Sequence, residues 1–235
     1  MIRLGSRAVA QFSMLESAAR KLGDLSKDFV FLGGCSTALL ITDPASPDVR
    51  STMDVDCIVD VISINDYYQL EKKLQKRGFL KSYSDEVVCR WHYDDLILDV
   101  MPTDERILGF SNRWYKEAIH HSTVHQLAED IFIRSVTAPY FLGTKLEAFQ
   151  IRGHNDFMGS HDFEDIIAVI DGRAELIEEV KKTTPILRTY LSETFSDMSL
   201  KDDFKTALPG HLNYGSVTQD RVRIILQRIK QICES

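Results

Sequence analysis

Two acidic residues stand one position apart in the stretch DVRSTMDVDCIVDV, which covers residues 48–61. The alternate positions are apolar: Val55, Cys57, Val59 and Val61. Because side chains alternate across a β-strand, Asp54 and Asp56 fall on the face opposite these residues, about 7 Å apart. Two carboxylates so close repel each other unless a cation lies between them, and Mg²⁺ prefers carboxylate and phosphate oxygens. The pair therefore indicates a metal site.

Two further features fit such a site. Asp99 alternates with apolar residues in LILDVMP, and it would complete a cluster of three carboxylates if its strand pairs with the strand of Asp54 and Asp56. Gly33 and Gly34 lie between a short apolar run and the start of a helical pattern, with Ser36 close behind. A turn of this kind presents backbone N–H groups and a positive helix end to an anion. Together the features predict a metal ion beside a phosphate group.

The elements that must position these residues follow from the hydrophobic pattern. The first part of the chain predicts helices and strands in alternation: helix 13–22, strand 29–34, helix 35–41, strand 53–63, helix 65–78 with Asn65 or Asp66 as N-cap, and a hairpin over 86–102 that turns at Asp94 and Asp95. The later part predicts only helices: 139–153, 162–172, 174–191 and 219–232. We expect an α+β protein with one domain over residues 1–136 and a helical domain over residues 137–235.

The order of these motifs resembles a known family. GGCSTALLI, RSTMDVDCIV and LILDVMP are similar to the N-terminal core of the DNA polymerase β-type nucleotidyltransferase superfamily, which has a Gly-Gly/Ser turn, a D-x-D strand and a later single Asp. APYFLGTKLEAFQIRG and HDFEDIIAVI are similar to the AbiEii-like branch, the toxins of type IV toxin–antitoxin pairs. The resemblance runs from about Phe29 to Ile170. It implies the nucleotidyltransferase fold, a mixed sheet with flanking helices, followed by a helical C-terminal domain.

The resemblance also implies roles for individual residues. It assigns metal binding to Asp54, Asp56 and Asp99, phosphate or nucleotide binding to Gly33, Gly34, Ser36, Lys145 and Arg152, and catalytic roles to the three metal ligands together with Lys145 and Asp162. Two Mg²⁺ or Mn²⁺ ions are implied, with a nucleoside triphosphate as substrate. His161 stands where the branch has a lysine before its late Asp. The residues alone allow another interpretation, in which Lys145 or Arg152 forms an interhelical ion pair with Asp162.

Composition limits the function further. The net charge of −7 gives no general attraction to nucleic acid or to an anionic membrane, so RNA binding would need a local basic patch such as residues 72–81. Surface exposure is the simpler interpretation of that patch. The four cysteines are scattered and no apolar run is long enough to span a bilayer, so we expect a cytoplasmic protein without membrane partners. His121 and His125 would share a helix face, but no third zinc ligand accompanies them at a familiar spacing.

The expected activity is transfer of a nucleoside monophosphate from a nucleoside triphosphate to an acceptor hydroxyl. The AbiEii-like resemblance implies RNA, such as tRNA, as acceptor, a role as toxin or defence enzyme, and a cognate antitoxin. Two alternatives remain open: transfer to a small molecule of the aminoglycoside type or to a protein, and an inactive module that only binds nucleotide. A Rossmann dinucleotide binder is excluded, because no G-x-G-x-x-G follows the first strand.

Overall fold

The computed structural model describes residues 5–61, 63–82, 85, 87–212 and 218–235, which divide into two compact units. The first, here called the sheet unit, contains Arg7–Leu39 and Ser51–Thr137. The second, the helical unit, combines Leu40–Arg50 with the described residues of 138–235 and with Gly5 and Ser6. The expected α+β class, a mixed sheet with flanking helices, is confirmed.

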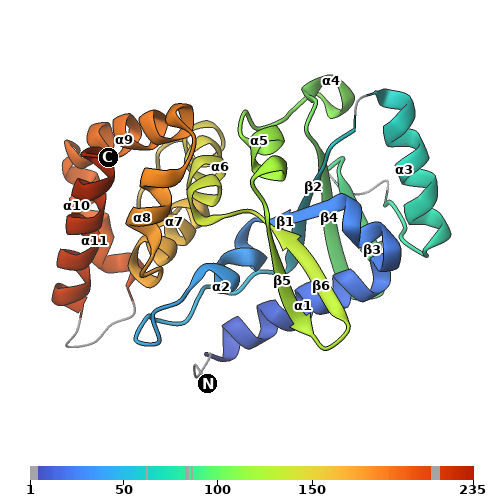
Figure 1. The fold of residues 1–235 in the computed structure, drawn as a ribbon, viewed down its shortest axis with the longest axis horizontal. Coiled ribbons are helices and arrows are strands. Elements are labelled where there is room, and N and C mark those ends of the chain that lie inside the picture. The colour runs from blue at the N-terminus through green and yellow to red at the C-terminus, as the bar shows by residue number, and fades with distance from the viewer. Residues whose placement is uncertain (1–4, 62, 83–84, 86, 213–217) are drawn as a thin grey trace. The chain divides into compact units, whose positions relative to one another are not determined.

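The sheet unit is built on a six-stranded sheet in the order β3-β4-β2-β1-β6-β5 (Figure 1). Its elements are α1 Ser6–Leu22, β1 Phe29–Leu32, α2 Thr37–Leu40, β2 Asp54–Val59, α3 Ile64–Lys76, β3 Arg90–Tyr93, β4 Leu96–Pro102, α4 Glu105–Leu108, α5 Tyr115–His120, β5 Thr123–Ala128 and β6 Ile131–Ser135. β2 pairs with β4, and β1 with β6, in parallel, whereas the other neighbours are antiparallel. β2 therefore lies inside the sheet, where its backbone is paired on both sides.

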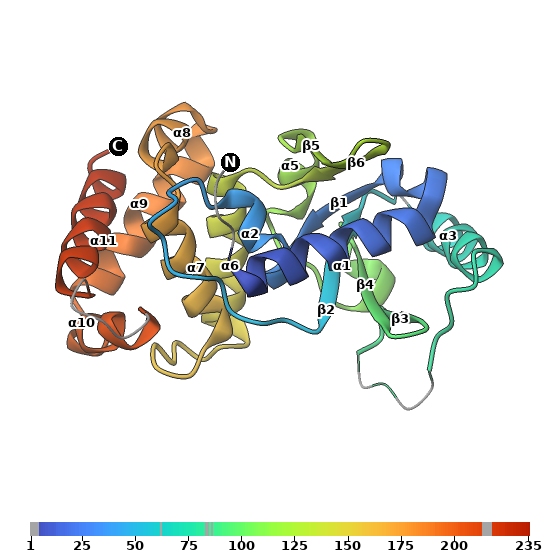
Figure 2. The ribbon, with the colours of Figure 1, turned by 90° about the horizontal axis from the view of Figure 1, so that it is seen from below.

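The main core of this unit lies between one face of the sheet and the helices α1 and α3. Leu15 and Leu22 of α1 and Leu70 and Leu74 of α3 pack in one buried cluster with the apolar side chains of the strands, and Figure 2 shows α1 lying along these strands. The strand residues in this cluster include Val55, Cys57, Val59, Leu98 and Val100. Because side chains alternate, Asp54, Asp56 and Asp99 lie on the opposite face of the sheet.

The helical unit has its own core. Its helices are α6 Ala138–Ile151, α7 His161–Gly172, α8 Leu176–Lys182, α9 Pro185–Ser199, α10 Asp202–Ala207 and α11 Thr218–Cys233. The segment 40–50 is held in this unit by its backbone and by charge. The N–H groups of Thr42 and Asp43 donate to the Gly172 carbonyl at 2.9 and 2.8 Å. Arg221 of α11 pairs with Asp171 at 2.6 Å and with Asp43 at 3.1 Å.

Several predicted elements differ in detail from those observed. The N-cap of α3 is Ser63, whose hydroxyl accepts from the Asp66 N–H at 3.2 Å, so the prediction of Asn65 or Asp66 was wrong. The predicted helix 174–191 is two helices, because Pro185 occupies the first turn of α9 and starts a new one. Ile62 and Glu86, at predicted strand positions, lie outside the described residues.

The β5–β6 hairpin was not predicted. It follows the end of α5 directly, so that His121 lies after the helix and His125 lies in β5. The two histidines therefore do not share a helix face, and the weak case for zinc is lost. Among the described helices none is long and apolar enough to cross a membrane.

Candidate active site

The three predicted metal ligands lie close together in the sheet unit. The parallel register of β2 and β4 places Asp56 opposite Asp99 and Asp54 opposite Ile97. The condition set by the sequence, that the strand of Asp99 pairs with the strand of the other two, is therefore met. The antiparallel register of β3 and β4 then places Arg90 opposite Asp99. Arg90, Asp99 and Asp56 thus form one row across three neighbouring strands.

Arg90 is bound to two of the carboxylates. Its Nε and Nη2 donate to the two Asp99 oxygens, both at 2.8 Å, and Nη2 also donates to Asp54 Oδ2 at 3.0 Å. The hydroxyl of Thr52 donates to the other Asp54 oxygen at 2.9 Å. The hydrogen bonds with Asp99 raise the pKa of Arg90, which stays charged. The protein thus places a positive group of its own in the acidic row.

The glycine turn lies against Asp56. Gly33 has φ +72° and ψ −167°, and a Cβ at this position would lie 1.9 Å from Asp56 Oδ2. Only glycine fits here, because it tolerates positive φ and leaves room for the carboxylate. The Ser36 N–H donates to the Gly33 carbonyl at 3.1 Å, and the buried Ser36 hydroxyl donates to the Leu32 carbonyl at 3.0 Å. Ser36 therefore stabilises the turn, and the backbone of Gly33 lies against the Asp56 carboxylate.

The chemistry of these donors suits a divalent metal, but their present arrangement does not. Carboxylate oxygens are the ligands that Mg²⁺ and Mn²⁺ prefer. Among the residues that the structure describes, no group of three or more His, Cys, Asp or Glu side chains is arranged to hold a metal ion. At this cluster the guanidinium of Arg90 lies between Asp54 and Asp99. The two predicted ions stay a prediction from the donor types.

The remaining predicted residues lie in the helical unit as a network of ion pairs. Lys145 Nζ lies 2.9 Å from Asp162 Oδ1 and 2.7 Å from Asp165 Oδ2. Arg152 donates to both oxygens of Asp162, at 2.9 and 3.0 Å, and Arg50 donates to both oxygens of Asp165, at 2.8 and 3.0 Å. The interhelical ion pair that the sequence allowed for Lys145 and Arg152 is therefore present. Lys145 and both aspartates are buried, whereas the Arg152 side chain is 71% exposed.

Burial and charge act in opposite directions in this network. Burial disfavours the ammonium form of Lys145, but the attraction of Asp165 and Asp162 is stronger and raises the pKa of Lys145. Burial likewise disfavours ionised Asp162, yet hydrogen bonds and charge from Arg152 and Lys145 hold the pKa of Asp162 well below its usual range. His161 is exposed and lies 3.4 Å from Glu164. Lys145 and Asp162 are thus both charged at neutral pH, and Lys145 is not a general base there.

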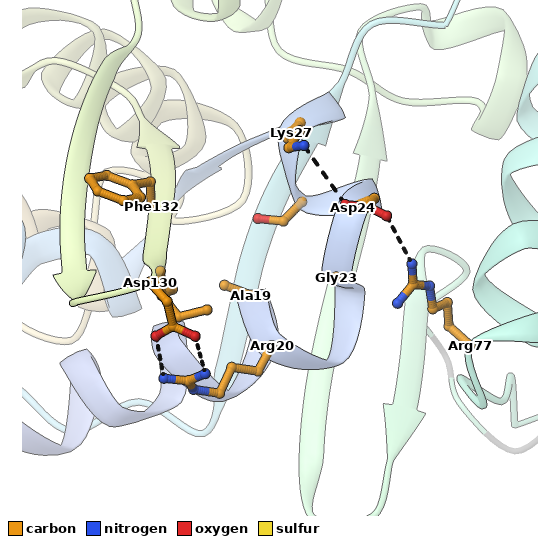
Figure 3. Close-up of a pocket in the computed structure, with 10 residues that line it drawn as sticks. Ala19, Arg20, Gly23, Asp24, Lys27, Arg77, Asp130 and Phe132 are labelled. Atoms are coloured by element: carbon orange, nitrogen blue, oxygen red, sulfur yellow. Dashed lines mark hydrogen bonds and ion pairs between the residues drawn. The ribbon is translucent and has the colours of Figure 1, made fainter.

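A groove elsewhere in the sheet unit contains none of the predicted residues. It encloses about 560 Å³, and Figure 3 shows Arg20 pointing toward Asp130, with Asp24 between Lys27 and Arg77. Arg20 pairs with Asp130 at 3.0 Å, and Asp24 lies 3.7 and 3.9 Å from Lys27 and Arg77. The cations of this groove already have acidic partners, so its charge gives little reason to expect an anionic ligand.

Sequence reasoning missed Arg90, although a signal for it existed. The hairpin turn at Asp94 and Asp95 was predicted, and counting back from it along both strands puts Arg90 opposite Asp99. The pairing of Arg50 with Asp165 had no such signal, because the partners are 115 positions apart.

Comparison with known proteins gives only distant likenesses. No family model and no curated protein matches the chain. A nucleotidyltransferase-like antigenic protein from Paracoccidioides brasiliensis is 20% identical with a TM-score of 0.48, over 87% of this chain and 93% of that one. A Helicobacter pylori protein described provisionally as a nucleotidyltransferase is 12% identical with a TM-score of 0.48, over 98% and 96%. JHP933 from Helicobacter pylori is 11% identical with a TM-score of 0.44, over 99% and 94%. Likenesses at this level decide neither the fold nor the activity.

Proposed function

We propose that this protein is a metal-dependent nucleotidyltransferase, which transfers a nucleoside monophosphate from a nucleoside triphosphate to an acceptor hydroxyl. The observation that carries the proposal is the acidic row: Asp56 and Asp99 face each other on parallel strands, with Asp54 on the same face and the Gly33 turn against Asp56. Three carboxylates gathered on one sheet face next to a glycine turn have no role in the core. Binding a metal and a phosphate gives them one.

The chain's own residues would orient the reactants. Mg²⁺ or Mn²⁺ held by Asp54, Asp56 and Asp99 would supply charge neutralisation at the phosphate oxygens. The backbone N–H groups of the turn at Gly33 and Gly34 would bind the nucleotide phosphates. The acceptor oxygen forms a bond to the α-phosphorus, the bond to the β-phosphate oxygen breaks, and pyrophosphate leaves. We assign the acceptor's proton to Asp99, which stands at the centre of the row.

The helical unit would contribute in a different way. Lys145 is enclosed by two carboxylates, so we assign it to positioning Asp162 and Asp165 rather than to contact with nucleotide. Arg152 holds Asp162 while its side chain is 71% exposed, and its nucleotide-binding role rests on the AbiEii-like motifs.

The proposal extends to the acceptor. RNA such as tRNA, a role as toxin or defence enzyme and a cognate antitoxin rest on the AbiEii-like motifs alone. In the basic patch of residues 72–81, Lys81 pairs with Glu71 and Arg77 lies 3.9 Å from Asp24, so part of its charge has acidic partners. Transfer to a small molecule or a protein is the alternative that the chain's net charge of −7 favours.

One assay separates these possibilities. The protein and its Asp54→Ala/Asp56→Ala variant are incubated with Mg²⁺, each labelled nucleoside triphosphate in turn, and total tRNA. Label in RNA from the wild type alone supports the proposal with RNA as acceptor. Label in small molecules or in protein moves the activity to the alternative acceptors. Nucleotide binding without transfer, and without any effect of the double variant, would show an inactive module instead.

A further inference from the structure

The contacts of Arg90 leave little place for a metal ion. Both oxygens of Asp99 accept from Arg90, and the two oxygens of Asp54 accept from Arg90 and Thr52. An oxygen has lone pairs to spare, but a divalent ion bound there would lie beside a guanidinium of the same sign. Metal binding and these hydrogen bonds therefore oppose each other.

The hairpin builds this contact into the fold. Arg90 and Asp99 are directly opposite in the antiparallel pair, and the two-residue turn that sets the register has Asp94 at φ +51°. The neighbouring residue Trp91 is fully buried in the core on the other face, so it fixes the strand under Arg90. The Arg90 side chain is 22% exposed, so its guanidinium group can move into solvent on its long aliphatic stem.

The charges of these carboxylates explain how the contact with Arg90 stabilises the protein. The row and the neighbouring Asp54 together hold three carboxylates, of which Asp54 and Asp99 accept from Arg90. Without a cation the carboxylates repel one another and weaken the fold, so a tethered guanidinium stabilises the metal-free protein. If a ligand binds only the form in which Arg90 is displaced, its apparent affinity is lower than its intrinsic affinity, because only a small fraction of the protein is in that form.

We propose that Arg90 is a built-in counter-ion that competes with the divalent metal for Asp54 and Asp99, so that metal binds only when the guanidinium leaves the row. This inference rests on the proposed function insofar as that function makes these carboxylates metal ligands. The site then becomes competent for transfer only when metal has bound, and nucleotide binding alone is not enough.

Binding of Mn²⁺, measured by the paramagnetic resonance of the free ion, tests the proposal without any activity. Arg90→Gln should bind Mn²⁺ roughly tenfold more tightly than the wild type, because one charge-assisted pair no longer has to be broken. The matched control is Arg106→Gln, since Arg106 also pairs with a neighbouring Asp but lies 80% exposed and outside the row. It should leave Mn²⁺ affinity unchanged. Equal or weaker binding by Arg90→Gln, or binding by neither protein, overturns the proposal.

A second measurement uses the wild type and does not depend on how the glutamine variant folds. The Nε–H resonance of Arg90, assigned by its loss in Arg90→Lys, should move toward the position of a solvated arginine as Mg²⁺ is added. A resonance unchanged at saturating Mg²⁺ contradicts displacement. If Arg90→Gln binds Mn²⁺ more tightly, Asp54→Asn abolishes that binding and no nucleotide is transferred, the proposed function fails while this inference stands.

Discussion

Gly33 has no room for a side chain, because the Asp56 carboxylate lies where a Cβ would be. Its backbone adds a second restriction, since the region at φ +72° and ψ −167° is essentially confined to glycine and costs another residue about 1–3 kcal/mol. The two restrictions have different consequences. Backbone strain lowers stability wherever it occurs, whereas the clash with Asp56 would also move a proposed metal ligand.

Gly33→Ala is therefore expected to destabilise the protein by more than the strain alone. Gly109 offers a matched control, because its φ is +82° and a Cβ there would meet nothing within 4 Å. We predict that Gly109→Ala lowers the free energy of unfolding by about 1 kcal/mol, and that Gly33→Ala lowers it by at least about 2 kcal/mol. Urea unfolding of both variants measures the difference. Equal losses would show that Asp56 moves aside without cost.

Asp99→Asn should abolish most transfer activity. Removing one charge from the centre of the row weakens both metal binding and proton acceptance, so we expect turnover to fall at least about 100-fold. Asp60→Asn is the control, because Asp60 follows β2, is exposed and accepts from Thr103 outside the row. Initial rates with saturating Mg²⁺ give the comparison. Similar losses in the two variants would speak against a special role for the row.

At the residue scale, the sequence predicted the features that follow from the alternation of side chains along a strand. Asp54, Asp56 and Asp99 lie on one face because two strands with apolar alternate residues have only one way to be buried. The hydroxyl of Thr52, two positions before Asp54, donates to Asp54 Oδ1. Arg50 donates to both oxygens of Asp165, and no local pattern indicates a partner so distant in sequence.

At the scale of elements, prediction depended on how apolar each segment is. The hairpin of β3 and β4 was found because Trp91, Leu96, Leu98 and Val100 are buried at alternate positions. β5 and β6 were missed for a different reason: Val124 and Phe132 are apolar but exposed, and Phe132 stands between Ile131 and Ile133, so apolar residues do not mark one buried face.

The contact of α6 with α7 is expected to depend on pH through Asp162. The native pKa of Asp162 is depressed, so its stabilising effect is fully present above the ordinary Asp pKa and is lost as the pH falls toward the native value. Asp162→Asn should cost about 1–3 kcal/mol at pH 7, and the difference from wild type should shrink below about pH 4.

Denaturant unfolding at several pH values measures this difference. Glu164→Gln on the same helix is the control, because Glu164 contacts only the exposed His161 side chain among the pairs given above. Its effect should be small and should not follow the same acid dependence. A constant difference between Asp162→Asn and wild type from pH 7 to pH 3 would contradict an ionised, depressed Asp162.

The strands also determine the reactivity of the cysteines. Cys57 of β2 and Cys89 just before β3 are buried, and burial raises the pKa of the Cys57 thiol well above its usual range and that of Cys89 to about 12. Cys35 is buried as well, whereas Cys233 at the end of α11 is partly exposed. A disulfide reagent at pH 8 should therefore modify one thiol quickly, and Cys233→Ser should remove this fast phase. Fast modification of the other three in the folded protein would contradict their burial.

At the scale of the whole molecule, the helical unit is discontinuous in sequence. The change of pattern near residue 138 indicated where its helices begin, but nothing local indicated that 40–50 belongs with them. The predicted boundary near residue 136 rests on the change to a helical pattern, so that segment falls within the predicted domain over residues 1–136. Its partners lie in α7 and α11, so only long-range contacts reveal its place.

A fragment of residues 138–235 should consequently be much less stable than the same helices in the full chain. It lacks Arg50 for buried Asp165, Asp43 for Arg221 and the Leu40 carbonyl that accepts from Arg173 at 2.9 Å. Asp165 keeps Lys145 and Arg221 keeps Asp171, so the fragment loses hydrogen bonds to charged groups, each of which contributes about 1.5–3 kcal/mol. Thermal unfolding followed by circular dichroism should show a broad transition at low temperature. Joining residues 40–50 to the fragment through a Gly/Ser linker should restore cooperativity. A fragment as stable without them would contradict this role.

Because the helical unit is discontinuous in sequence, its parts are synthesised at different times. Asp43 is synthesised 178 residues before Arg221. At about 5–20 residues per second, roughly 10–35 s pass between the synthesis of Asp43 and that of Arg221. The strands β1 and β2 on either side of it can pair during that interval, since every strand of their sheet has been synthesised once residue 135 is added. The paired strands therefore hold residues 40–50 as a loop that has not yet met all its partners. In a nascent chain that stalls before α11, the acidic residues of this loop stay exposed.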